Sequence, residues 1–60
     1  MKLKKKEQHI FLKLVEELNE LSTELLHAIN KPSKDNATEI LAEIKDVEDR
    51  ISAIKDILDK

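Results

Sequence analysis

The sequence predicts an all-α protein, an antiparallel helical hairpin that self-associates into a four-helix bundle. The 60 residues include no glycine and one proline, and Leu, Ile, Glu, Lys and Asp dominate the composition. This composition favours long helices over sheet. Apolar residues also recur at alternating spacings of three and four along two stretches, which is typical of amphipathic helices. We therefore expect one helical-hairpin domain over residues 1–60.

The first helix is expected over about residues 5–30. Asn30 suits a left-handed cap at its C-terminal end, and Pro32 prevents the helix from continuing. Residues 31–36 then form a short polar turn. The apolar positions of this helix are Phe11, Leu14, Val15, Leu18, Leu21, Leu25, Leu26, Ala28 and Ile29.

The second helix is expected over about residues 37–58. Asn36 is a favourable N-cap residue, and Glu39 would complete a capping box with it. A short connection makes two amphipathic helices antiparallel neighbours. Two helices enclose no core and the chain has no cysteine, so a second copy must cover both stripes, in a dimer or a larger even oligomer. The apolar positions of this helix are Ile40, Ile44, Val47, Ile51, Ile54 and Leu58.

Charge and composition argue against several classes of protein. With 13 acidic and 11 basic side chains, the net charge of −2 provides no overall field for nucleic acid. No apolar run approaches the ~20 residues of a membrane span. Glu7, Gln8 and His9 follow the N-terminal lysines where a signal peptide would be apolar. We expect a cytoplasmic protein that does not bind a membrane. The net acidity also disfavours nucleic acid as a partner.

Two acidic clusters lie within the predicted helices, one over residues 16–20 and one over residues 43–46. A spacing of three places both acids of each pair on one face of its helix. If the helices pair antiparallel, the four carboxylates converge and offer the oxygen ligands that Mg²⁺ requires. The alternative is that these are ordinary charged positions at the border of a bundle core. The four converging carboxylates are those of Glu17, Glu20, Glu43 and Asp46.

The order Glu-Glu-x-x-Glu, a gap and then Glu-x-x-Asp resembles the all-α nucleoside triphosphate pyrophosphohydrolases of the MazG-like group. The matching stretches are residues 14–21 and 40–48, and the likeness covers roughly residues 10–58. The resemblance implies a hydrolase that uses Mg²⁺, or Mn²⁺ as a substitute, to split a nucleoside triphosphate into monophosphate and pyrophosphate. It implies that the metal ligands are Glu17, Glu20, Glu43 and Asp46.

The resemblance also implies a role for Glu16 as a catalytic helper acid. Members of the group are usually longer, with further helices that cover the nucleotide, and Ala42 stands where they commonly carry another Glu. Four basic residues are candidates for binding the substrate phosphates because of their charge alone. They are Lys31, Lys34, Lys45 and Arg50.

Two other functions remain open from the sequence. The first is a non-enzymatic adaptor or regulator that binds a protein partner through the surface of its helical bundle. The second is an RNA-binding hairpin dimer of the Rop type, which the net acidity and the lack of a basic stripe disfavour. His9 and His27 are expected at the surface.

Overall fold

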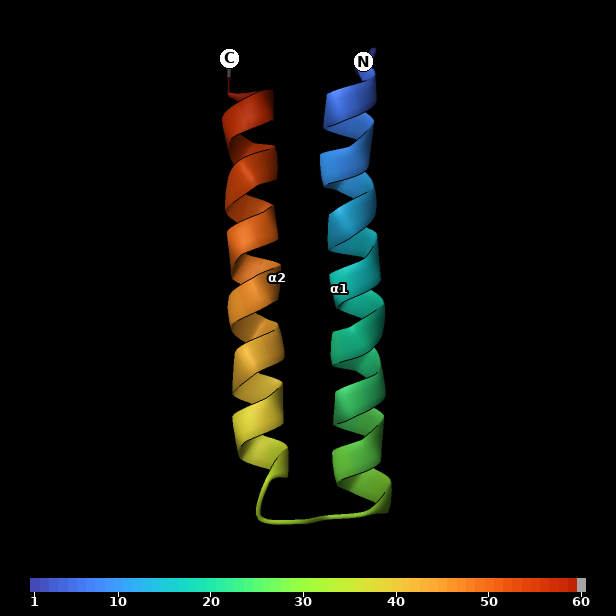
Figure 1. The fold of residues 1–60 in the computed structure, drawn as a ribbon, viewed down its shortest axis with the longest axis vertical. Helices are drawn as coiled ribbons and strands as arrows, with labels where there is room; N and C mark the ends of the chain where they lie inside the picture. Colours follow the sequence, from blue (N-terminus) through green and yellow to red (C-terminus); the bar gives the residue numbers. More distant parts are fainter. Residues whose placement is uncertain (60) are drawn as a thin grey trace.

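The computed structural model describes residues 1–59 and is all-helical. Helix α1 spans Lys5–Asn30 and helix α2 spans Asn36–Leu58. The helices lie side by side and antiparallel, so α1 begins at the end of the molecule where α2 ends (Figure 1). The predicted all-α helical hairpin is confirmed. No helix among the described residues is long and apolar enough to cross a membrane.

Helix α1 is capped at its start by Glu7, whose Oε1 accepts a hydrogen bond of 2.9 Å from the Lys4 backbone N–H. At its end the Lys31 N–H donates to the His27 carbonyl at 2.7 Å, which continues the helical ladder by one bond. Lys31 has φ −138° and ψ 75°, and no residue within 1–59 has a positive φ. The predicted left-handed cap at Asn30 is therefore wrong. Pro32 disfavours the helical conformation of the preceding Lys31, and the chain leaves α1 through that residue.

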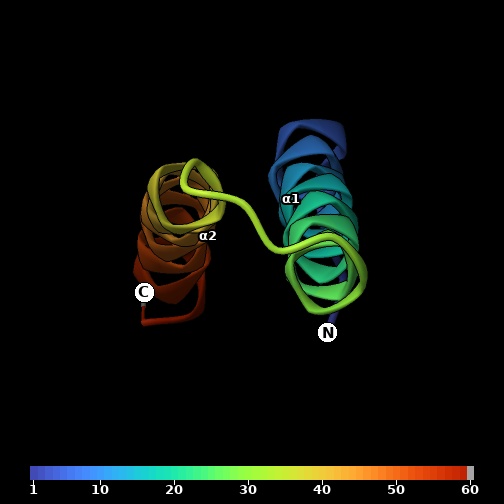
Figure 2. The same ribbon diagram turned by 90° about the horizontal axis from the view of Figure 1, so that it is seen from below.

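Helix α2 begins one residue earlier than predicted, with Asn36 already inside the helix and Asp35 at the cap position. The Asp35 side chain makes no capping hydrogen bond. Asn36 Oδ1 instead accepts a bond of 2.6 Å from the Ser33 backbone N–H. The predicted N-cap at Asn36 and its capping box with Glu39 are therefore wrong. The Asn36 side chain organises the connection between the two helix ends, which Figure 2 shows from below.

The two helices contact each other along a seam with the alternating spacing of a coiled coil. Val47 in this seam is 7% exposed and Asn36 is 9% exposed, and the other members of the seam are half-buried. Four of these positions are glutamates, so the helix interface is only partly apolar. The seam consists of Glu7, Ile10, Leu14, Glu17, Leu21, Glu24 and Ala28 on α1, and of Asn36, Ile40, Glu43, Val47, Ile54 and Ile57 on α2.

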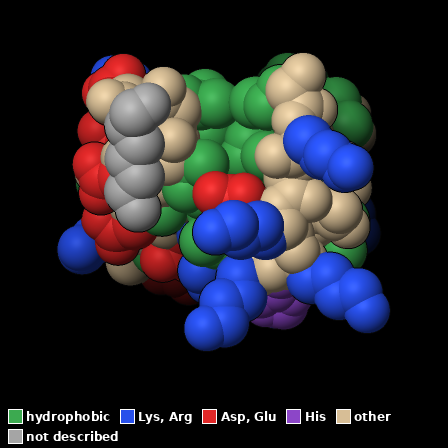
Figure 3. All heavy atoms as spheres, turned by 90° about the horizontal axis from the view of Figure 1, so that it is seen from above, with side chains coloured by type: hydrophobic (Ala, Val, Ile, Leu, Met, Phe, Trp, Pro, Cys, Tyr) green, Lys and Arg blue, Asp and Glu red, His purple; other side chains and the backbone are tan. Residues whose placement is uncertain are grey.

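The seam divides the surface of the hairpin into two broad faces. In an antiparallel pair, residues that follow a seam position by one flank the seam on the same side on both helices. Apolar and charged side chains accordingly gather on different sides of the helix pair in Figure 3. The apolar face consists of Phe11, Val15, Leu18, Leu25, Ile29, Leu41, Ile44, Ile51 and Leu58.

The opposite face carries charged residues, most of which precede a seam position by one. We call it the charged face, and every one of its members apart from Lys13 is exposed. It includes six acidic residues and two basic ones, Lys13 and His27. The charged face consists of Lys13, Glu16, Glu20, His27, Glu39, Asp46, Asp49 and Asp56.

Candidate metal centre

Three carboxylates converge where the seam meets the charged face. Glu17 of α1 and the pair Glu43 and Asp46 of α2 each offer one oxygen, and these oxygens all lie within 4.8 Å of one another. Glu43 and Asp46 are three residues apart, so they project from the same side of α2 on successive turns. The antiparallel register brings Glu17 opposite them. The carboxylate cluster, as we name these three residues, therefore depends on both helices.

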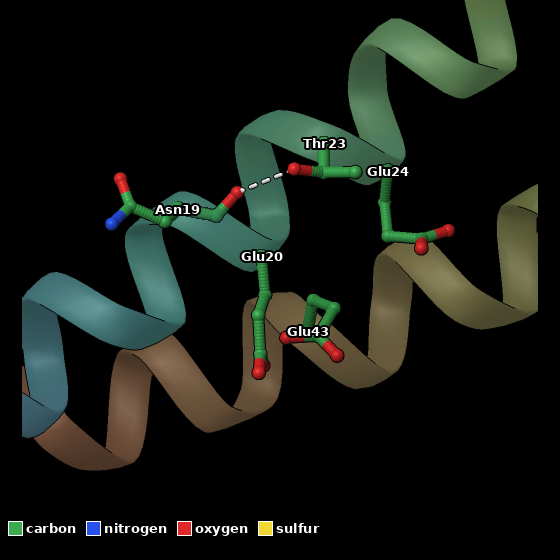
Figure 4. A pocket seen from close by; sticks show the side chains of 5 residues that line it. All are labelled: Asn19, Glu20, Thr23, Glu24 and Glu43. Carbon is green, nitrogen blue, oxygen red and sulfur yellow. Dashed lines mark hydrogen bonds between the residues drawn. The ribbon is translucent and has the colours of Figure 1, made fainter.

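Glu20 lies next to the carboxylate cluster, and its nearby carboxyl group helps to raise the pKa of Glu43. Figure 4 shows the two side chains between the helices, at an open groove of about 350 Å³. Thr23 also lines the groove, but its hydroxyl donates to the Asn19 carbonyl at 3.0 Å. That hydroxyl is therefore engaged within its own helix, and carboxylates supply the ionisable groups of the groove.

A further acidic pair, Glu24 and Glu39, lies nearer the turn. The nearby carboxyl group of Glu24 raises the pKa of Glu39. Neither residue was among the predicted metal ligands. The sequence spacing could have indicated Glu24. It lies seven residues after Glu17 and therefore occupies the same position of the helical repeat.

The surroundings raise the pKa of two carboxyl groups of the cluster. Desolvation raises the pKa of Glu17, and the nearby carboxylates of Glu20 and Asp46 add to it, while Arg50 acts in the opposite direction. Desolvation also raises the pKa of Glu43, followed by the charge of Glu20 and a hydrogen bond with it. The negative charges are thus held close together, and Arg50 offsets them only in part.

Three carboxylate oxygens of the seam have no hydrogen-bond partner among the described residues. They are buried Oε2 atoms, and an acceptor in such a position is costly to leave unsatisfied. A divalent cation would provide the missing positive charge for the converging carboxylates of Glu17, Glu43 and Asp46. Hard oxygen donors are the ligands that Mg²⁺ and Mn²⁺ prefer, so this set of residues fits such an ion. The three unpartnered atoms belong to Glu17, Glu24 and Glu43.

The remaining candidate residues lie at different distances from the cluster. Glu16 is exposed and pairs with Lys13 at 3.3 Å, outside the three converging oxygens. Lys45 is exposed and pairs with Asp49 at 3.6 Å. Arg50 acts on the Glu17 carboxyl and so lies beside the cluster.

The two lysines of the turn, Lys31 and Lys34, lie beyond the end of α1. At ~1.5 Å of rise per residue, Lys31 is about 16 Å along the helix axis from Glu20. Of the four predicted phosphate-binding residues, the structure therefore brings only Arg50 to the carboxylates, because the others project from the turn or from the outer surface of α2.

Comparison of the chain with protein-family models, with curated proteins and with solved structures finds no match in any of the three. The chain is an all-α helical hairpin with an acidic cluster between its two helices.

Proposed function

We propose that the protein is a Mg²⁺-dependent nucleoside triphosphate pyrophosphohydrolase of the MazG-like type. The observation that carries this proposal is the convergence of one carboxylate from α1 with two from α2, with oxygens within 4.8 Å of one another. Together with Glu20 beside them, these residues are the four that the motif resemblance picks out as metal ligands. The resemblance and the geometry thus share three positions, Glu17, Glu43 and Asp46.

In this proposal Glu17, Glu43 and Asp46 hold the cation, and Glu20 adds a fourth carboxylate from the side of the groove. A bound Mg²⁺ neutralises phosphate charge and orients or activates water for attack on phosphorus. The groove beside Glu20 is open to solvent, which gives a triphosphate access to the cluster.

The other residues have supporting roles in this proposal. Arg50, beside Glu17, is the basic residue best placed to meet a phosphate group. Glu16 lies on the charged face together with Glu20 and Asp46, and serves there as the helper acid. Lys31, Lys34 and Lys45 would have to reach the phosphates from the turn or from the outer surface of α2.

A second candidate function rests on a different observation, the apolar face. Ile29 is 74% exposed and Leu41 is 65% exposed, and both belong to a surface that extends over the two helices. Large exposed apolar patches mark interaction sites. The second candidate is therefore a non-enzymatic helical-bundle adaptor or regulator that binds a protein partner.

The two candidates differ in what happens to a panel of nucleoside triphosphates incubated with the protein and Mg²⁺. The enzyme releases pyrophosphate and a monophosphate, and Glu20→Gln and Asp46→Asn abolish this turnover. Asp49→Asn is the matched control, since it removes one negative charge from the same face outside the cluster. Release of orthophosphate, or no turnover of any triphosphate by the folded protein, would refute the proposed activity.

A further inference from the structure

The hairpin exposes more surface than a compact chain of its mass. Its accessible surface is 5048 Å² for 6.9 kDa. A compact monomer of that mass exposes about 4,000 Å². The Cα radius of gyration of 14.0 Å likewise exceeds the value of about 10 Å for a compact domain of this length. The excess of about 1,000 Å² compares with the ~800 Å² that each partner buries in a standard protein interface.

Much of the exposed apolar area lies on the apolar face. Leu18 is 44% exposed and Leu25 is 45% exposed on α1, while Ile44 and Ile51 on α2 are 37% and 38% exposed. Each of these pairs is separated by seven residues, so its members point in the same direction from their helix. Val47 is the one hydrophobic residue among those described that the hairpin itself buries. The interface between two helices alone thus leaves most of the apolar side chains in water.

The apolar side chains of the two helices are arranged in common layers. In the register set by the pair Glu17 and Asp46, Phe11 lies within one residue of the level of Ile51, about 1.5 Å along the helix axis, and Leu18 lies equally close to the level of Ile44. A second hairpin placed on this face would bring two more apolar side chains to each of these levels. Four inward-facing side chains per layer are the packing of a four-helix bundle.

We infer that the apolar face of one chain is covered by the apolar face of a second copy, so that each carboxylate cluster lies on the outside of the dimer. A second copy fits because it has the same length, the same layer spacing and an equal surplus of surface. The charged face cannot serve as this contact, since it would bring Glu20 and Asp46 against like charges of the other copy. Each chain then holds a complete carboxylate cluster that needs no residue from its partner. This inference does not depend on the proposed activity.

The test compares two leucines of α1 by sedimentation and light scattering at micromolar concentration. Leu18→Glu places a charge on the apolar face and shifts the assembly to monomer. Leu12→Glu is the matched control, because Leu12 is 56% exposed and lies outside the apolar face. We expect the parent and Leu12→Glu to have the mass of a dimer or of a larger even assembly. A parent chain that is a folded monomer under these conditions would overturn the inference.

Thiol accessibility gives a second measurement in case Leu18→Glu fails to fold. The chain has no cysteine, so Leu18→Cys and Asp49→Cys each introduce a single thiol. If the apolar face is covered, the Leu18→Cys thiol reacts several-fold more slowly with a maleimide than the Asp49→Cys thiol, and it speeds up on dilution. Equal rates at all concentrations in a folded dimer would show that the copies associate through another surface.

Discussion

Glu24 on α1 lies against Glu39 on α2, two carboxyl groups meeting where a helical bundle ordinarily pairs opposite charges. The same antiparallel register produces further acidic contacts along the hairpin, and the residue numbers of each pair add to the same total. Repulsion is thus part of the helix interface, which links the stability of the fold to protons and cations. The further pairs are Glu20 with Glu43 and Glu17 with Asp46.

Acidification from neutral pH is expected to stabilise the hairpin. The pKa values of Glu17, Glu39 and Glu43 are raised above 4.5 in the folded state. Above that pH the folded state therefore binds more protons than the unfolded state, and the free energy of unfolding falls as pH rises through the folded pKa values. Urea unfolding followed by circular dichroism between pH 4.5 and 7.5 measures this slope.

The variant Glu39→Gln should flatten this pH dependence, because it removes one carboxyl group from the facing pair. Asp56→Asn is the control, since Asp56 is exposed near the end of α2. A parent protein whose stability rises steadily with pH over this range would contradict the assignment of repulsive acidic pairs.

Mg²⁺ is expected to raise the melting temperature beyond any effect of ionic strength. A ligand that binds only the folded state at one hundred times its Kd stabilises it by about 2.7 kcal/mol. Asp46→Asn should remove this response and leave the metal-free protein at least as stable as the parent, because it relieves repulsion with Glu17. Asp49→Asn should keep the response. Calorimetry that detects no Mg²⁺ binding to the parent would rule out the metal centre.

Val47 should be the most sensitive apolar position of α2. Val47→Ala removes two buried methyl groups and should cost about 1.5 kcal/mol of unfolding free energy. Val47→Asp should unfold the chain, because it buries an unpaired charge. Leu12→Ala is the control, and an exposed site of this kind should change stability by less than about 0.5 kcal/mol. Similar losses for both alanine variants in chemical unfolding would argue against the observed seam.

Asn36→Ala is expected to cost roughly 1 kcal/mol, because it removes the hydrogen bond that Asn36 Oδ1 accepts from the Ser33 N–H. Asn36→Asp keeps an acceptor at the same position and should recover most of that loss. Chemical unfolding of the two variants at equal chain concentration makes the comparison. A loss in Asn36→Asp as large as that in Asn36→Ala would show that the hydrogen bond is not the cause.

The helices were predictable from the sequence because their signals are local. The spacing of Leu14 and Leu21 predicted the first helix, that of Ile40 and Val47 predicted the second, and Pro32 marked the turn. The details at the helix ends were not predictable in the same way. Asn36 can accept a bond from its own helix or from the turn, and the geometry of residues 31–35 decides in favour of Ser33.

The candidate site was predictable only as far as spacing within one helix allows. Glu43 and Asp46 share a face of α2 by their spacing, but their distance from Glu17 depends on the register between the helices. That register also decides that Glu24 meets Glu39. No local signal in the sequence distinguishes this arrangement from one shifted by a turn of the helix.

The five-residue connection between Asn30 and Asn36 has a consequence for how the chain folds. It closes a very short loop, so the entropy lost in bringing the first facing residues together is small. Each further layer adds contacts next to those already formed, from Glu24 and Glu39 outward to the chain ends. Such low contact order favours folding in microseconds to milliseconds. Pairing of the helices should therefore spread from the turn, and docking of a second hairpin should be the slower, concentration-dependent step.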